Sequence, residues 1–339
     1  MTTFHEATGQ TPIRDLKLAI EGTPLAPLVE QATLELEAGG VRRLKPRYYL
    51  STEWGVPFGT IAVAIPFYLA HPDLTRLHEE RTSHVEGVSR ADILRYLRHE
   101  LGHAVSYAYR LHARADWTEA FGAIDRPYVE DYRPEPFSKN HVQHLPGWYA
   151  QKHPDEDWAE TFAVRITPGR DWRSEYASWP RALAKLELCD RLLAEIGDRA
   201  PEVTADDLDE DVDELDYSLE HYYRTGSGQV DALELPGLDG ALVAAFEDLR
   251  ARDDTPAGAA MRPAGALLLA LETELVASVF KWTGHFPERT RRLLRHLAIR
   301  AEALSIAYPA THERAAITAV VTFVTSLAMS HVHRGSYLA

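Results

Sequence analysis

Cysteine is almost absent from this chain. Cys189 is the single cysteine among 339 residues, so no disulfide can form within the chain and nothing points to an oxidising compartment. The first thirty residues also lack the apolar stretch of a signal peptide and instead carry Glu6, Asp15, Glu21 and Glu30. We therefore expect a cytoplasmic protein.

Long apolar runs and positive charge are scarce as well. The stretches 60–70 and 315–330 come nearest to a membrane span, but both are too short, so we expect buried structure and no membrane contact. Lys and Arg number 36 against 51 Asp and Glu, a formal net charge of −15, which repels nucleic acid. Nucleic acid is therefore not an expected partner. Apolar residues make up 45% of the chain, enough to build real cores.

The N-terminal part mixes helix and strand patterns. Apolar spacing predicts a helix over 13–36, broken at 22–24. The stretches 47–54 and 60–69 are rich in β-branched and aromatic residues, and they predict two paired strands, the second at an edge because Pro66 lacks an N–H. We expect this small sheet within a lobe spanning about 40–88.

Helical periodicity then takes over. Ser89, followed three residues later by Asp92, predicts a capped helix over about 89–112. Two further helices are expected at about 154–167 and 180–196.

An acidic run without a basic residue covers 202–216 and predicts a domain boundary or exposed loop. We therefore expect two domains, 1–200 and 201–339, the second mainly helical and of unknown role. Helical spacing without a competing strand signal recurs in the second domain at 242–250, 264–281, 287–307 and 312–331.

The candidate chemistry lies in the His-Glu-Leu-Gly-His motif at 99–103. On a helix, His99 and His103 project from one face and can reach one ion, while Glu100 can address a water bound to that ion. A catalytic zinc also needs a third protein ligand. Glu156 and Glu160 share one face of the expected helix at 154–167, and spacing alone does not separate them.

The motif at 99–103, followed by Trp-Tyr-Ala-Gln-Lys-His-Pro-Asp-Glu-Asp-Trp-Ala-Glu-Thr-Phe-Ala at 148–163, resembles the bacterial zinc-binding metallopeptidases of the gluzincin type. The resemblance covers about 45–196. It implies an α+β, zincin-like domain with a small N-terminal sheet and an active-site helix. It also implies that Glu156 is the third ligand and that Glu160 supports a ligating histidine, with Glu160 as the alternative ligand.

The same region is similar to the catalytic domain of anthrax lethal factor, in which a tyrosine stands seven residues before the ligand glutamate. Tyr149 stands seven residues before Glu156 here. The similarity implies that Tyr149 stabilises the oxyanion of the transition state.

These assignments predict a zinc-dependent peptidase with one Zn²⁺ per chain, Glu100 as general base and a peptide or protein as substrate. The expected edge strand could pair with an extended peptide. Its residues are Thr60, Ile61, Ala62, Val63 and Ala64.

Two other functions stay open. The same two histidines and one carboxylate can hold Fe(II), as in non-haem oxygenases. Alternatively, a zincin fold could serve as a binding module, with partner or regulatory contacts made through the helical C-terminal domain.

Overall fold

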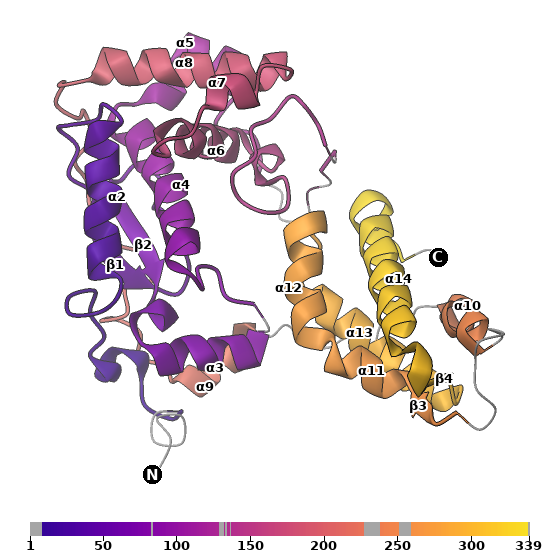
Figure 1. The fold of residues 1–339 in the computed structure, drawn as a ribbon. Helices are drawn as coiled ribbons and strands as arrows, with labels where there is room; N and C mark the ends of the chain where they lie inside the picture. The colour runs from indigo at the N-terminus through magenta and orange to yellow at the C-terminus, as the bar shows by residue number, and fades with distance from the viewer. Residues whose placement is uncertain are drawn as a thin grey trace. The chain divides into compact units, whose positions relative to one another are not determined.

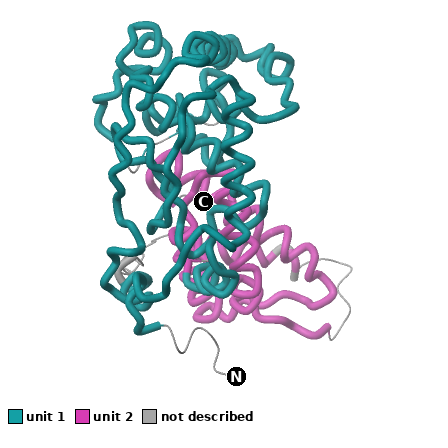
Figure 2. Tube along the Cα trace, turned by 90° about the vertical axis from the view of Figure 1, so that its left-hand side faces the viewer, with its two compact units in different colours: residues 1–81, 85–226 teal, residues 82–84, 227–339 magenta. Residues whose placement is uncertain are grey.

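The computed structural model describes residues 9–82, 84–128, 132, 134–135, 137–226, 238–250 and 259–337 (Figure 1). The chain divides into two compact units (Figure 2). The first contains 1–81 and 85–226, and the second contains 82–84 and 227–339. Helices dominate, and the described strands form two small sheets, so the chain is broadly α+β with a helical C-terminal part.

The sheet of the first unit consists of two parallel strands, β1 (Arg47–Ser51) and β2 (Ala62–Pro66), with Tyr49 opposite Ala64. The predicted pairing of these two stretches is confirmed. Every residue of β2 is buried, and β2 lies against helix α4 (Arg90–Ala108) (Figure 1).

The helix expected at 13–36 is two separate elements, the 3₁₀ turn η1 (Ile13–Leu16) and helix α2 (Ala26–Ala38). Gly22 between them has a φ of 76°, in the left-handed region that interrupts a right-handed helix. Helix α3 (Pro72–Thr82) also lies within 40–88, the range expected to hold the small sheet.

The helices that position the candidate site form close to where the sequence predicts them. Ser89 caps α4 by accepting a hydrogen bond from the N–H of Asp92 at 3.1 Å. The next predicted helix is α6 (Pro154–Ile166) and the third is α8 (Pro180–Ile196). Shorter elements complete the described part of the unit: η2 (Phe67–Ala70), η3 (Leu111–Ala113), α5 (Ala115–Phe121), η4 (Tyr149–Gln151), α7 (Trp172–Glu175) and α9 (Leu219–Gly226).

Helices α4 and α6 approach each other closely at Gly102. A Cβ atom at this position would lie 2.8 Å from Cα of Ala159, too close for a real contact. The carbonyl of Gly102 also accepts a hydrogen bond from the indole of Trp158 at 2.8 Å. The missing side chain therefore allows the two helices to pack backbone against backbone.

The expected boundary at 200–201 lies inside the first unit, which continues to Gly226. Residues 202–216 are mostly exposed, as their charge predicts, but their backbone is tied to the first unit. Ala205 accepts a hydrogen bond from Ile61 at 2.8 Å, and Val212 donates one to Leu50 at 3.1 Å. These contacts make the acidic run part of the domain surface.

The second unit is mainly helical. Its helices are α10 (Leu238–Arg250), α11 (Ala264–Ala270), α12 (Glu272–Thr283), α13 (Pro287–Ala303) and α14 (Glu313–Arg334). A short antiparallel pair, β3 (Met261–Pro263) and β4 (Ala307–Pro309), was not expected. Each of these strands has three residues, too few to produce a readable alternation of apolar and polar positions.

Within the described chain, the stretch Ala310–Arg334 is long and apolar enough to cross a membrane by length and composition alone, with 28% of its apolar window buried. Core helices of soluble proteins meet the same criterion. One stripe of α14, which includes Val320, Val324 and Leu327, packs into the core of the second unit. The expectation of buried structure at 315–330 holds for this stripe only.

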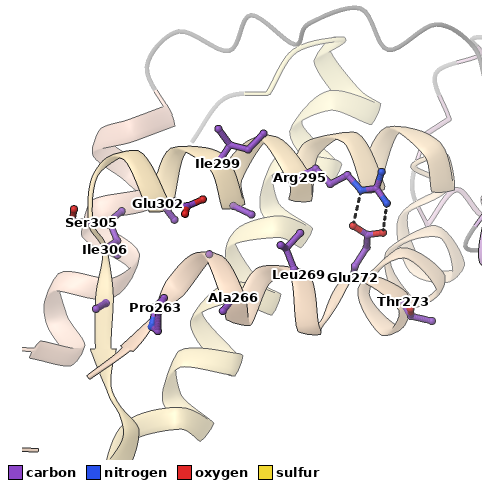
Figure 3. A pocket seen from close by; sticks show the side chains of 14 residues that line it. Pro263, Ala266, Leu269, Glu272, Thr273, Arg295, Ile299, Glu302, Ser305 and Ile306 are labelled. Carbon is purple, nitrogen blue, oxygen red and sulfur yellow. Dashed lines mark hydrogen bonds and ion pairs between the residues drawn. The ribbon is translucent and has the colours of Figure 1, made fainter. Parts of the chain in front are cut away.

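An open groove of about 980 Å³ runs along α11 and α13 in the second unit (Figure 3). Leu269 and Ile299 expose apolar surface there. Arg295 and Glu272 also line the groove, where Arg295 donates two hydrogen bonds to Glu272, at 3.0 and 3.2 Å.

Candidate metal centre

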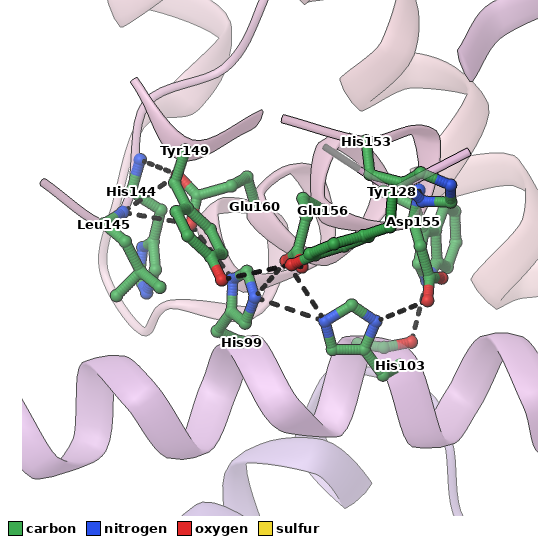
Figure 4. Close-up of polar contacts among 12 residues, drawn as sticks. His99, His103, Tyr128, His144, Leu145, Tyr149, His153, Asp155, Glu156 and Glu160 are labelled. Atoms are coloured by element: carbon green, nitrogen blue, oxygen red, sulfur yellow. Dashed lines mark hydrogen bonds and ion pairs between the residues drawn. The ribbon is translucent and has the colours of Figure 1, made fainter. Parts of the chain in front are cut away.

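Helices α4 and α6 bring together three side chains of types that can ligate a metal ion. Nε2 of His99 and Nε2 of His103 lie 3.2 Å apart, and Oε2 of Glu156 is 3.0 Å from the first and 3.4 Å from the second (Figure 4). All three side chains are buried. In the part of the chain that the structure describes, this is the one group of three such residues with converging ligand atoms, and it can hold a metal ion.

Both carboxylate oxygens of Glu160 are engaged in contacts outside the point where the three ligand atoms converge. Its Oε1 lies 3.0 Å from Nδ1 of His99, and its Oε2 accepts hydrogen bonds from the backbone N–H groups of His144 at 2.7 Å and Leu145 at 2.8 Å. Of the two glutamates that spacing did not separate, Glu156 therefore faces the cluster, and Glu160 orients His99 from behind.

A second carboxylate lies behind His103. Oδ2 of Asp155 is 3.1 Å from Nδ1 of His103, and it also accepts a hydrogen bond from the hydroxyl of Tyr107. Burial raises the pKa of Asp155, but His103 outweighs burial and lowers it. Sequence reasoning missed this residue, because neighbouring positions on a helix point in different directions and its contact with His103 is tertiary.

Two histidines outside the motif, His144 and His153, hydrogen-bond to the backbone. His153 caps α6, because its Nδ1 accepts from the N–H of Asp155 at 3.2 Å while its Nε2 donates to the carbonyl of Arg126 at 2.8 Å. Nε2 of His144 donates to the carbonyl of Arg95 at 2.9 Å. Neither belongs to the metal-binding group.

The carboxylates control how readily the two imidazoles take up protons. Burial lowers the pKa of His99, but hydrogen bonds to Glu156 and Glu160 outweigh it and raise this pKa to about 9. The pKa of His103 is raised in the same way by Asp155 and Glu156. A metal ion at this site would have to displace these protons, so its binding would depend on pH.

Glu100 lies between the two histidines on α4 and is buried. Burial raises the pKa of its carboxyl group, while His99 and His103 oppose the rise. A carboxylate with a raised pKa binds a proton more readily, as a general base must. Glu100 is therefore a buried carboxyl group next to the histidine cluster with a raised affinity for a proton.

Two tyrosines, not one, reach the cluster. The ring of Tyr149 lies 5.6 Å from that of His99, and its hydroxyl is 3.5 Å from the hydroxyl of Tyr128. Tyr128 in turn donates a hydrogen bond of 2.6 Å to Oε1 of Glu156. Sequence reasoning identified Tyr149 but missed Tyr128, which lies in a loop-rich stretch with several aromatic residues and no distinguishing pattern.

The expected peptide-docking strand requires a correction. Thr60, Ile61, Ala62, Val63 and Ala64 are all buried in the domain. The N–H of Ile61 donates to Ala205, and the N–H of Ala64 donates to Gly55 at 2.8 Å. Because chain segments of the same domain already use these groups, an extended peptide cannot pair with them.

Comparison with known proteins adds no relative: no family model, no curated protein and no solved structure matches this chain. The arguments about function therefore rest on the chemistry of the cluster itself.

Proposed function

We propose that this chain is a zinc-dependent peptidase of the gluzincin type, with a zincin-like fold in its first unit. The observation that carries the proposal is the convergence of His99, His103 and Glu156 beside the buried Glu100. Two imidazoles and one carboxylate match the ligand set of catalytic zinc sites that keep one position open for substrate.

The surroundings of the ligands fit one Zn²⁺ per chain. Each ligating histidine has a carboxylate at its Nδ1, Glu160 for His99 and Asp155 for His103. Such partners fix the tautomer that presents Nε2 to a metal. The same ligand set also suits Fe(II), but an acid between the two histidines is the residue that hydrolysis requires.

When bound, zinc would polarise the scissile carbonyl and lower the pKa of the attacking water. Glu100 would accept a proton from that water as the C–O bond forms, and would deliver it to the departing amine as the C–N bond breaks. The Tyr149 hydroxyl would donate a hydrogen bond to the developing oxyanion. Tyr128 would hold Oε1 of Glu156 and leave Oε2 directed at the histidines.

The proposal includes a cytoplasmic location and a peptide or protein substrate. Nucleic acid is not included, since the net charge of −15 disfavours it. The helical second unit would make partner or regulatory contacts.

The test compares zinc-loaded wild-type protein with Glu100→Gln on a peptide library, with cleavage read by mass spectrometry. Glu119→Gln, at an exposed position on α5, is the matched control. We expect Glu100→Gln to lose at least about 100-fold in rate while it retains zinc, and the control to keep full activity. Equal cleavage by wild type and Glu100→Gln would overturn the proposal, as would iron content with oxygen-dependent turnover.

A further inference from the structure

The exposed aromatic side chains of the first unit are connected to the metal centre, Tyr128 directly and the others through a neighbouring residue. Among its described residues, the large apolar side chains that are exposed are Leu34, Phe58, Val88, Tyr128 and Phe137. Each aromatic member of this set is linked to the cluster. Tyr128 hydrogen-bonds Glu156, and Phe58 packs on Tyr107, which donates to Asp155. Phe137 packs edge to face on Trp148, the residue before Tyr149, with ring centroids 5.7 Å apart.

The pair Phe137–Trp148 also has an unusual backbone. The φ angle is 60° at Phe137 and 54° at Trp148. Bulky residues rarely adopt this left-handed region, and where they do, the strain often marks a functional site. Phe137 is 76% exposed, so burial of its own ring does not compensate for the strain.

The segments that carry the two rings are fastened to each other. The N–H of Glu135 donates to the side-chain oxygen of Gln151 at 2.7 Å, and the amide nitrogen of Gln151 donates to the carbonyl of Glu135 at 2.8 Å. The hydroxyl of Tyr132 donates to the carbonyl of Gly147 at 2.7 Å. The pair is therefore organised beside η4, which carries Tyr149, before any ligand arrives.

We propose that Phe137 and Trp148 bind a bulky apolar side chain, preferably an aromatic one, of a peptide substrate near the scissile bond. This inference rests on the proposed peptidase function. An exposed aromatic ring held by a second ring offers a flat, uncharged surface on which an incoming aromatic side chain can stack and lose its contact with water. Trp148 lies next in sequence to Tyr149, so such a side chain would be close to the reacting group.

The test uses pairs of peptides that differ only by Phe or Gly at one position, drawn from sites that the wild-type enzyme cleaves. The variants are Phe137→Ala and Phe137→Asn, the latter because Asn tolerates a left-handed backbone. Leu34→Ala, also at an exposed apolar position but on α2, is the control. We expect both Phe137 variants to lower the Phe-to-Gly ratio of kcat/KM by about 10-fold or more, and Leu34→Ala to leave that ratio unchanged.

A second measurement does not depend on turnover. Fluorescence anisotropy of a labelled Phe peptide should show binding to the zinc-loaded Glu100→Gln protein, and adding Phe137→Ala should raise the Kd about 10-fold or more. If no peptide in the library is cleaved in a Glu100-dependent way, the proposed function is overturned. The anisotropy measurement alone then tests whether Phe137 and Trp148 bind an aromatic side chain. Cleavage without an aromatic preference, or with a preference that both Phe137 variants keep, would overturn this inference alone.

Discussion

Replacing Glu160 by Gln should weaken zinc binding about 10- to 100-fold. Glu160 is fully buried, and its two oxygens serve Nδ1 of His99 on one side and the backbone N–H groups of His144 and Leu145 on the other. A glutamine has one oxygen and cannot accept from both sides. If its NH₂ group faces His99, the imidazole shifts its proton to Nε2, the atom that faces Glu156. If the NH₂ group faces the loop instead, it lies against the backbone N–H groups of His144 and Leu145, which are also hydrogen-bond donors.

Both orientations have a cost that can be stated. The predicted loss of affinity corresponds to about 1.4 to 2.7 kcal/mol of zinc-binding free energy. A glutamine whose NH₂ group faces the loop leaves buried N–H groups without an acceptor, which lowers the free energy of unfolding by about 1–3 kcal/mol. Zinc binding requires the orientation in which the oxygen faces His99, whereas the metal-free protein can adopt either one. Zinc affinity should therefore fall, and the free energy of unfolding of the metal-free protein should change less.

The assays are chelator competition for the zinc Kd and urea unfolding of the metal-free protein. Glu187→Gln, at an exposed position of α8, is the control and should match wild type in both. Unchanged zinc affinity in Glu160→Gln would refute the orienting role. A loss of zinc as complete as in Glu156→Ala would show that Glu160 is itself a ligand.

Three further predictions follow from the same geometry. Tyr149→Phe should lower kcat about 100-fold or more at unchanged zinc affinity, whereas Tyr128→Phe should raise the zinc Kd because Glu156 loses its hydrogen bond. Steady-state kinetics measures the first effect and chelator competition the second. Reversed results would contradict the two assigned roles. Gly102→Ala should lower the free energy of unfolding, measured with urea, by about 1–3 kcal/mol. The control Gly240→Ala should not lower it, because the space around Gly240 is open. Equal stability of Gly102→Ala and wild type would refute the close-packing argument. Burial lowers the pKa of His144 from 6.5 to about 4, so this imidazole is neutral when folded and binds a proton when unfolded, and stability should fall as the pH drops from 6.5 toward 4. This fall in the free energy of unfolding should be shallower in His144→Gln than in wild type. Parallel pH profiles of stability for the two proteins would contradict the role assigned to His144.

Local signals explain which parts of the fold could be predicted. Ser89 caps α4, and Pro154 and Pro180 stand at the first positions of α6 and α8, so caps and periodicity locate these helices from nearby residues alone. The end of the first unit depends instead on backbone contacts such as that from Ile61 to Ala205, between segments far apart in sequence. No local sequence pattern predicts such long-range contacts.

The candidate site follows the same division. The helical positions of His99 and His103 follow from their spacing. The choice between Glu156 and Glu160 does not, because both lie on one face of α6, and it is the backbone N–H groups at 144–145 that engage Glu160. Tyr128 reaches Glu156 from a loop, so its role depends on a tertiary contact that the neighbouring residues in the sequence do not predict.

Metal content is the most direct test of the account. Element-resolved stoichiometry should be measured on purified wild-type protein beside Glu156→Ala and Glu187→Ala. The account predicts about one zinc per chain in wild type and in the Glu187 variant, and little or none in Glu156→Ala. No transition metal in wild type after incubation with excess zinc would contradict the metal centre, and zinc fully retained by Glu156→Ala would contradict its assigned ligands.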